Sequence, residues 1–190
     1  MNCKSKIFVI CFSIIVCFFK YSFSLSSNDI NKFSEKAFFT LITGNYEKLF
    51  SMFYIPSDYD KTDRENDREA VIRGIKYVMG QLGEIKSFYR VTKIDEMFYK
   101  FAIYPGPFEE IQNKKGFLNV FKVEFAKFGS GYIGFESLGI NSKLYLKKVI
   151  FLLPQQNSES IGIIQRVVKY MLDMSDKQSK REKKGKDENI

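Results

Sequence analysis

The chain has 190 residues, of which 45% are hydrophobic and 27% are charged, proportions typical of a single folded domain and not of a disordered or fibrous protein. It contains no histidine, which excludes a Ser-His-Asp triad and a histidine-ligated metal site built from this chain alone. The formal net charge is +8, but the basic residues are spread along the sequence and form no dense stripe, so we expect no nucleic-acid binding.

Residues 1–24 have the pattern of a secretory signal peptide. Two lysines precede the largely apolar stretch 7–19, and the small residues Ser22 and Ser24 follow at the spacing of a cleavage site. The apolar stretch would rise about 20 Å as a helix, whereas a bilayer core is about 30 Å thick. We therefore predict export to the periplasm or the extracellular space. The alternative is an uncleaved segment that anchors the protein to a membrane.

The predicted cleavage changes the inventory of reactive groups. All three cysteines lie within residues 1–24, so a mature chain from Leu25 would have no disulfide, no thiolate nucleophile and no cysteine-ligated metal. Three lysines leave with the same segment, and 27 basic and 22 acidic residues remain. We predict no cofactor and no metal site, and a hydrophobic core that provides the stability.

The first part of the mature chain has the period of helices. Apolar residues recur every three or four positions over 30–41, which predicts a first helix. Gly44 and Asn45 interrupt the pattern, and a short second helix follows and ends before Pro56.

A third helix is predicted behind a polar segment. Almost every residue of 57–68 is polar or charged, which predicts an exposed connection. Asn66 and Glu69 have the spacing of a capping box, and an apolar stripe continues from Val71 to an end at Gly83.

The period then changes to two, which indicates strands. Glycine- and proline-containing breaks separate these segments and connect them by short loops, so we predict antiparallel pairing. The predicted strands cover 87–94, 97–104, 117–128, 132–138 and 144–153.

The chain is predicted to end with a helix and a tail. The helix begins near Ser158 and has one apolar face formed by Ile161, Ile164, Val168 and Met171. Residues 176–190 are charged or polar and have nothing to bury, so we predict a disordered tail after a folded domain that spans 25–175.

Two stretches resemble the NTF2-like (cystatin-like cone) superfamily. The stretch AFFTLITGNYEKLFSMF, residues 37–53, is similar to the superfamily's opening helix pair with its Gly-Asn/Asp-Tyr break. The stretch GIKYVMGQLGEIKSFYRV, residues 74–91, is similar to the third helix and the Leu-Gly turn into the first strand. The resemblance implies an α+β fold in which N-terminal helices pack against a curved antiparallel sheet that encloses a conical pocket. The C-terminal helix would be an addition to it.

Members of this superfamily include isomerases and dehydratases, binding proteins and periplasmic parts of secretion machinery. A cofactor-free isomerase or dehydratase would need a pocket carboxylate, such as Asp95 or Glu124, together with a phenol from Tyr99, Tyr132 or Tyr145. Strand parity turns Glu124 away from the aromatic face, and Asp95 falls in a turn, so we predict no catalytic residue.

Aromatic residues are the most distinctive feature of the mature chain, which keeps 15 Phe and 10 Tyr. Most of them should fill the core, and the remainder are predicted to border a pocket for an apolar small molecule or a peptide. The residues predicted to do so are Phe101, Phe121, Phe125, Tyr132 and Tyr145.

The resulting prediction is an exported, non-catalytic binding or assembly module. Its partner would be an apolar small molecule or a protein, including a second copy of the chain, and it would meet a membrane only if residues 1–24 are retained. The alternatives are a small isomerase or dehydratase and an anchored component of an envelope complex.

Overall fold

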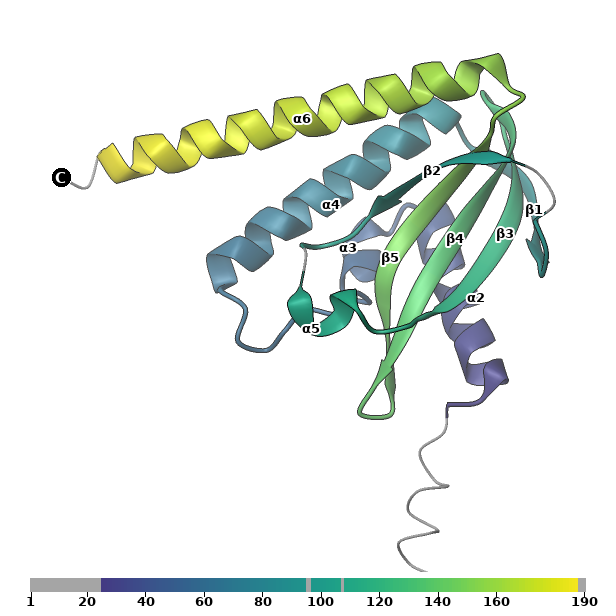
Figure 1. Cartoon of the computed structure of the whole chain (residues 1–190), viewed down its shortest axis with the longest axis horizontal. Helices are drawn as coiled ribbons and strands as arrows, with labels where there is room; N and C mark the ends of the chain where they lie inside the picture. The colour runs from purple at the N-terminus through teal and green to yellow at the C-terminus, as the bar shows by residue number, and fades with distance from the viewer. Residues whose placement is uncertain (1–24, 95–96, 107, 188–190) are drawn as a thin grey trace, which may run out of the picture.

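The computed structural model describes residues 25–94, 97–106 and 108–187. Helices α2 (Ser27–Ile42), α3 (Tyr46–Phe50) and α4 (Lys61–Leu82) come first, a five-stranded antiparallel sheet follows, and helix α6 (Ser158–Asp187) comes last (Figure 1). The predicted α+β class, with N-terminal helices, an antiparallel sheet and a C-terminal helix, is confirmed. The predicted signal peptide lies outside the described residues.

The sheet does not follow the order of the chain. Its strands are β1 (Ile85–Val91), β2 (Phe98–Ile103), β3 (Phe117–Phe125), β4 (Gly129–Ile140) and β5 (Lys143–Pro154), and the short helix α5 (Glu109–Gln112) lies between β2 and β3. Their order across the sheet is β1-β3-β4-β5-β2. Strands β1 and β2 therefore form its two edges and run in the same direction, so they cannot pair as the hairpin that their closeness in sequence suggests.

One face of the sheet packs against the helices and forms the core. The Phe38 ring of α2 stacks on Phe121 of β3, with ring centroids 4.4 Å apart, and lies edge-on to Phe135 of β4. Alternate residues of the strands point to this face, and Val123, Phe125, Ile133, Val149 and Phe151 are all almost completely buried on it.

Helix α4 begins earlier than the sequence predicts. Asp60 is its N-cap and accepts hydrogen bonds from the backbone N–H groups of Thr62, at 2.7 Å, and Asp63, at 3.2 Å. The predicted exposed connection is wrong over 61–68, and Asn66 lies inside the helix instead of capping it. The charged residues of this stretch favour helix, and within it the Arg68 guanidinium pairs with Glu65 three residues earlier.

The predicted apolar face of α6 packs against the body only in part: Ile164 contacts the core, but the helix is turned so that a neighbouring stripe is the more deeply buried one. Ile163 and Val167 are 2% and 5% exposed, whereas Ile161 and Val168, from the predicted face, are 48% and 51% exposed. Polar and aromatic contacts set this rotation. The Tyr170 ring stacks on Tyr77 of α4 at 4.0 Å, and the Arg166 Nε donates a hydrogen bond to the Gln81 Oε1 at 2.7 Å.

Helix α6 continues to Asp187, whereas the composition predicts a disordered tail from 176. Its last turns are rich in lysine, with single arginine, glutamate and glutamine residues, and these residue types favour helix without needing burial. Figure 1 shows α6 along the top of the molecule, beside the C-terminal end of α4. Among the helices in the described part of the chain, none carries an apolar stretch long enough for a bilayer.

Candidate functional site

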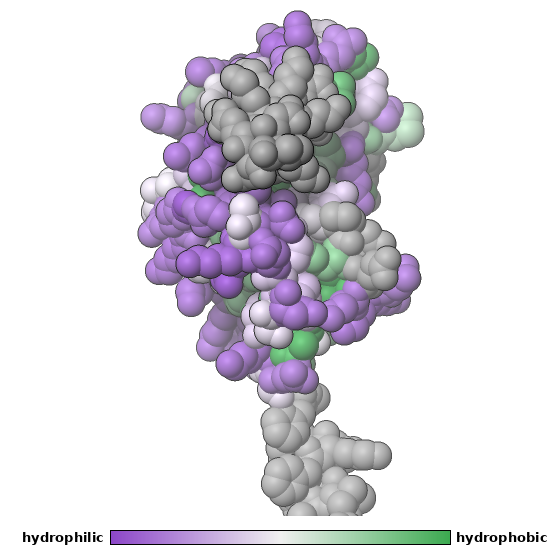
Figure 2. All heavy atoms as spheres, turned by 90° about the vertical axis from the view of Figure 1, so that its left-hand side faces the viewer, coloured by the Kyte–Doolittle hydropathy of each residue, from purple (hydrophilic) through white to green (hydrophobic). Residues whose placement is uncertain are grey.

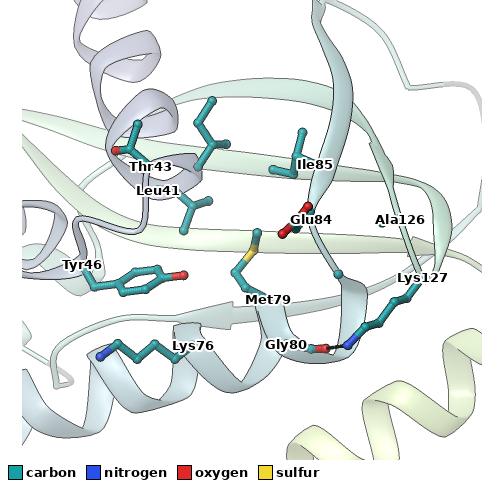
Figure 3. Close-up of a pocket in the computed structure, with 12 residues that line it drawn as sticks. Leu41, Thr43, Tyr46, Lys76, Met79, Gly80, Glu84, Ile85, Ala126 and Lys127 are labelled. Atoms are coloured by element: carbon teal, nitrogen blue, oxygen red, sulfur yellow. Dashed lines mark hydrogen bonds between the residues drawn. The ribbon is translucent and has the colours of Figure 1, made fainter.

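A cleft of about 850 Å³ lies where the helix ends meet the start of the sheet (Figure 3). Five segments form it: the C-terminal turn of α2, the start of α3, the last turns of α4, the start of β1 and the turn between β3 and β4. Its lining residues are Leu41, Ile42, Thr43, Tyr46, Lys76, Met79, Gly80, Gly83, Glu84, Ile85, Ala126 and Lys127.

The cleft combines an apolar floor with a polar rim. Figure 3 shows the Met79 thioether and the Tyr46 hydroxyl pointing into the space that Leu41 and Ile85 border. The Lys76 amine lies 5.6 Å from the centre of the Tyr46 ring, a cation–π distance. Such a surface suits a ligand that has both apolar and charged parts.

The charges of the rim favour an anionic ligand. Lys76 and Lys127 are exposed and cationic, and Glu84 is the one carboxylate among the lining residues. Burial raises the pKa of the Tyr46 phenol, which therefore stays neutral and can donate a hydrogen bond to an anion.

A glycine allows the walls of the cleft to meet. Gly83 ends α4 with a φ of +87°, and a Cβ at this position would lie 2.9 Å from the backbone nitrogen of Lys127. The Lys127 N–H donates to the Leu82 carbonyl at 3.1 Å, and the Ala126 N–H donates to the Glu84 carbonyl at 2.7 Å. The Lys127 amine also donates to the Gly80 carbonyl at 3.0 Å, so the β3–β4 turn is fixed against the end of α4.

The structure does not bring the five predicted pocket residues together, and none of them lines this cleft. Phe121, Phe125 and Tyr132 are at most 4% exposed and are core residues. Phe101 is half-buried and stacks on the core residue Phe151, with centroids 5.1 Å apart, and the half-buried Tyr145 lies edge-on to Tyr54.

The alternation of side chains along each strand explains why these residues point to opposite faces of the sheet. Tyr132 is the register partner of Lys122 and therefore shares its face of the sheet, opposite to the face of Phe121 and Phe125. Glu124 also lies on the Lys122 face, as predicted, and accepts a hydrogen bond from the Ser130 hydroxyl at 2.8 Å. Asp95 lies outside the described residues.

The sequence pattern missed the residues that do line the cleft. They come from helix ends and turns, which no strand or helix period brings together. One signal was present: Met79 is apolar but only half-buried, at the border of the stripe of Val71, Ile75, Val78 and Leu82 that α4 buries. An apolar residue that is left half-exposed at the border of a helix's buried stripe is available to line a cleft.

Two carboxylate–phenol pairs lie elsewhere. The Tyr59 hydroxyl donates to the Asp67 Oδ2 at 2.8 Å, and burial raises the pKa of Asp67. The Tyr54 hydroxyl donates to the Glu110 Oε2 at 2.6 Å. Asp67 lies on α4 nine residues before Lys76, about 14 Å along the helix from the cleft. Within the described residues, no three acidic, cysteine or histidine side chains gather closely enough to hold a metal ion.

Comparisons with known proteins found no relative. No family model matches the chain. No curated protein and no solved structure matches it either.

Proposed function

We propose that this chain is an exported, non-catalytic binding module that holds an apolar, anionic group in the cleft between α2, α4 and β1. The observation that carries the proposal is the composition of the cleft, in which the apolar side chains of Leu41, Met79 and Ile85 line the same space as two lysine side chains, Lys76 and Lys127. Apolar area provides affinity for such a ligand, and the amines orient it.

The surroundings of the cleft support binding over catalysis. A general base needs a site from which water is excluded, whereas Glu84, the one carboxylate of the cleft lining, is exposed to solvent. The alternative, a small isomerase or dehydratase, is favoured by the Tyr59–Asp67 pair, because a carboxylate of raised pKa beside a phenol suits acid–base chemistry. No cleft residue belongs to that pair.

A large assembly surface has less support on the face that Figure 2 presents. There the coloured surface is mostly hydrophilic, and hydrophobic side chains form only small, separate groups. Protein surfaces that dock permanently onto a partner usually expose a larger continuous apolar patch.

An NTF2-like cone remains part of the proposal. The edge strands β1 and β2 are joined by six residues, 92–97. The edges of a flat five-stranded sheet lie about 19 Å apart, and the seven peptide steps from Val91 to Phe98 reach at most about 24 Å. The reach exceeds the span, so this connection is compatible with a flat sheet and with a curled one, as in a cone; the resemblance of residues 37–53 and 74–91 is what supports the cone.

Export through residues 1–24 is proposed together with the binding role. N-terminal sequencing of the protein recovered from its native compartment tests it. A first residue at or near Leu25 supports cleavage and export. A chain that still begins at Met1 in the membrane fraction supports the anchored alternative instead.

An anionic naphthalenesulfonate dye tests the cleft, because it has an apolar ring system and one negative charge. We expect the folded protein to enhance the dye's fluorescence, and Met79→Glu and Lys76→Glu to weaken binding by about tenfold each. Met97→Glu is the matched control, since Met97 is 74% exposed and lies outside the cleft. Equal dye binding by all four proteins, with unchanged circular dichroism, would contradict the proposal.

A further inference from the structure

The cleft opens beside a free strand edge. β1 pairs with β3 on one side and is the last strand of the sheet on its other side, so in the described part of the chain that edge has no strand partner. Residues 86–90 of β1 are all exposed. A strand edge of this kind presents backbone N–H and C=O groups that another extended chain can pair with.

Helix α2 runs beside this edge and forms a continuous wall with it. Glu35 of α2 pairs with Arg90 of β1 at 3.8 Å, and one turn further on Phe39 meets Phe88 edge-on, with ring centroids 5.7 Å apart. Phe39 is 51% exposed and Phe88 is 38% exposed. At the end of this wall Ile42 and Ile85 both line the cleft, so the edge, the two exposed rings and the cleft are contiguous.

The net positive charge around the free edge of β1 indicates which kind of chain would bind there. Residues 85–94 contain Lys86, Arg90 and Lys93 and no acidic residue, and Lys76 and Lys127 line the cleft end. Two carboxylates lie nearby, Glu35 paired with Arg90 and Glu84 in the cleft lining, so five basic side chains face two acidic ones. Pairing with the same edge of a second copy would bring two basic seams together, which disfavours it. A strand from a partner protein that carries acidic side chains would instead place opposite charges side by side, which favours pairing.

We infer that an extended, acidic segment of a partner protein adds to the free edge of β1 as a sixth strand. Its apolar side chains rest on Phe39 and Phe88, and its end reaches the cleft beside Ile85. Strand addition supplies backbone hydrogen bonds along the edge, and alternate side chains supply specificity. The inference rests on the proposed function and names the class of partner that the same site takes.

The probe is a synthetic peptide of alternating valine and glutamate, about seven residues long to match β1. We expect it to bind the full chain and to protect the β1 amides from hydrogen exchange. A peptide with lysine in place of glutamate, and a glutamate peptide N-methylated at alternate backbone nitrogens, should each bind at least about tenfold more weakly.

Two substitutions locate the binding on the protein. Lys86→Glu should weaken binding of the acidic peptide and strengthen binding of the lysine peptide. Lys100→Glu on β2, the other edge strand, should change the affinity for neither peptide. Phe39→Ser should weaken binding by about tenfold. Its matched control is Leu118→Ser, because Leu118 is exposed to the same degree, 52%, and lies on β3.

The outcomes separate the inference from the proposed function. Dye binding that survives while no peptide binds overturns strand addition and leaves the cleft proposal intact. Equal binding of acidic and basic peptides overturns the charge argument, and with it the inference. Protection of β1 that appears with self-association, without peptide, assigns the edge to a second copy and also overturns it. Loss of both dye and peptide binding contradicts both proposals.

Discussion

Two tyrosines are held by carboxylates on neighbouring parts of the surface. Tyr54 donates to Glu110 and Tyr59 donates to Asp67. The hydrogen bond to Glu110 raises the pKa of Tyr54 to about 12, and burial together with the bond to Asp67 raises the pKa of Tyr59 to about 12. Both bonds require the neutral phenol, so they persist until strongly alkaline pH.

These phenols predict how the fold responds to alkali. Because their pKa values in the folded state lie above the ordinary phenol value of about 10, their contribution to stability is complete below pH 10 and is lost as the pH rises towards 12. Ultraviolet titration of the native protein should show late-ionising tyrosines that include Tyr54 and Tyr59. Tyr54→Phe and Tyr59→Phe should each remove one phenol from this late-ionising group. Ionisation of all tyrosines together near pH 10 would show that these hydrogen bonds are absent.

Single residues also show where sequence reasoning stops. Parity correctly turns Glu124 away from Phe121 and Phe125. It cannot reveal that Phe38 of a distant helix covers Phe121, which makes that face core and not a pocket wall. The cleft residues Tyr46, Met79 and Lys127 meet only through tertiary packing, so no local pattern predicts their site.

At the scale of elements, the start of α4 depends on one cap. Asp60 accepts backbone hydrogen bonds from the first turn, whereas Asn66 lies within the helix. We expect Asp60→Ala to lower the free energy of unfolding by about 1 kcal/mol, and Asn66→Ala to lower it by less than about 0.5 kcal/mol. Urea denaturation of both variants measures this. A larger loss from Asn66→Ala would place the helix start at the capping box that the sequence suggests.

The rotation of α6 can be tested in the same way. Ile163 is 2% exposed and belongs to the core, whereas Ile161, two residues earlier, is 48% exposed. Ile163→Ala should lower the free energy of unfolding by about 2–5 kcal/mol, and Ile161→Ala by less than about 0.5 kcal/mol. Thermal or urea unfolding distinguishes the two. The reverse order of effects would mean that the helix packs through its other apolar stripe.

The same helix shows why its packing face was mispredicted. Its sequence has apolar residues on two adjoining stripes, Ile161 with Val168 and Ile163 with Val167, and periodicity alone does not choose between them. The choice depends on partners far away in the sequence. Tyr77 and Gln81 of α4 receive Tyr170 and Arg166, and this contact turns the second stripe inward.

For the whole molecule, the sequence predicts the class of fold better than its connections. Helical and strand periods, with glycine and proline between them, correctly predict three N-terminal helices, an antiparallel sheet and a C-terminal helix. The separation of β1 from β2 depends on which long strand each one pairs with, and such non-local pairing leaves no periodic signal. The position of the candidate cleft cannot be predicted from the sequence for the same reason, because the cleft lies at the start of β1 and β1 is an edge strand only through this non-local pairing.

The central claim is that ligands bind in the cleft where α2, α4 and β1 meet. The most direct test follows the backbone amides of the isotope-labelled protein by NMR while the anionic naphthalenesulfonate dye is added. We predict that chemical shifts change first for residues 41–46, 79–85 and 126–127, which contain most of the cleft lining. Changes centred instead on Phe101, Phe121 and Phe125, with the cleft amides unmoved, would contradict it.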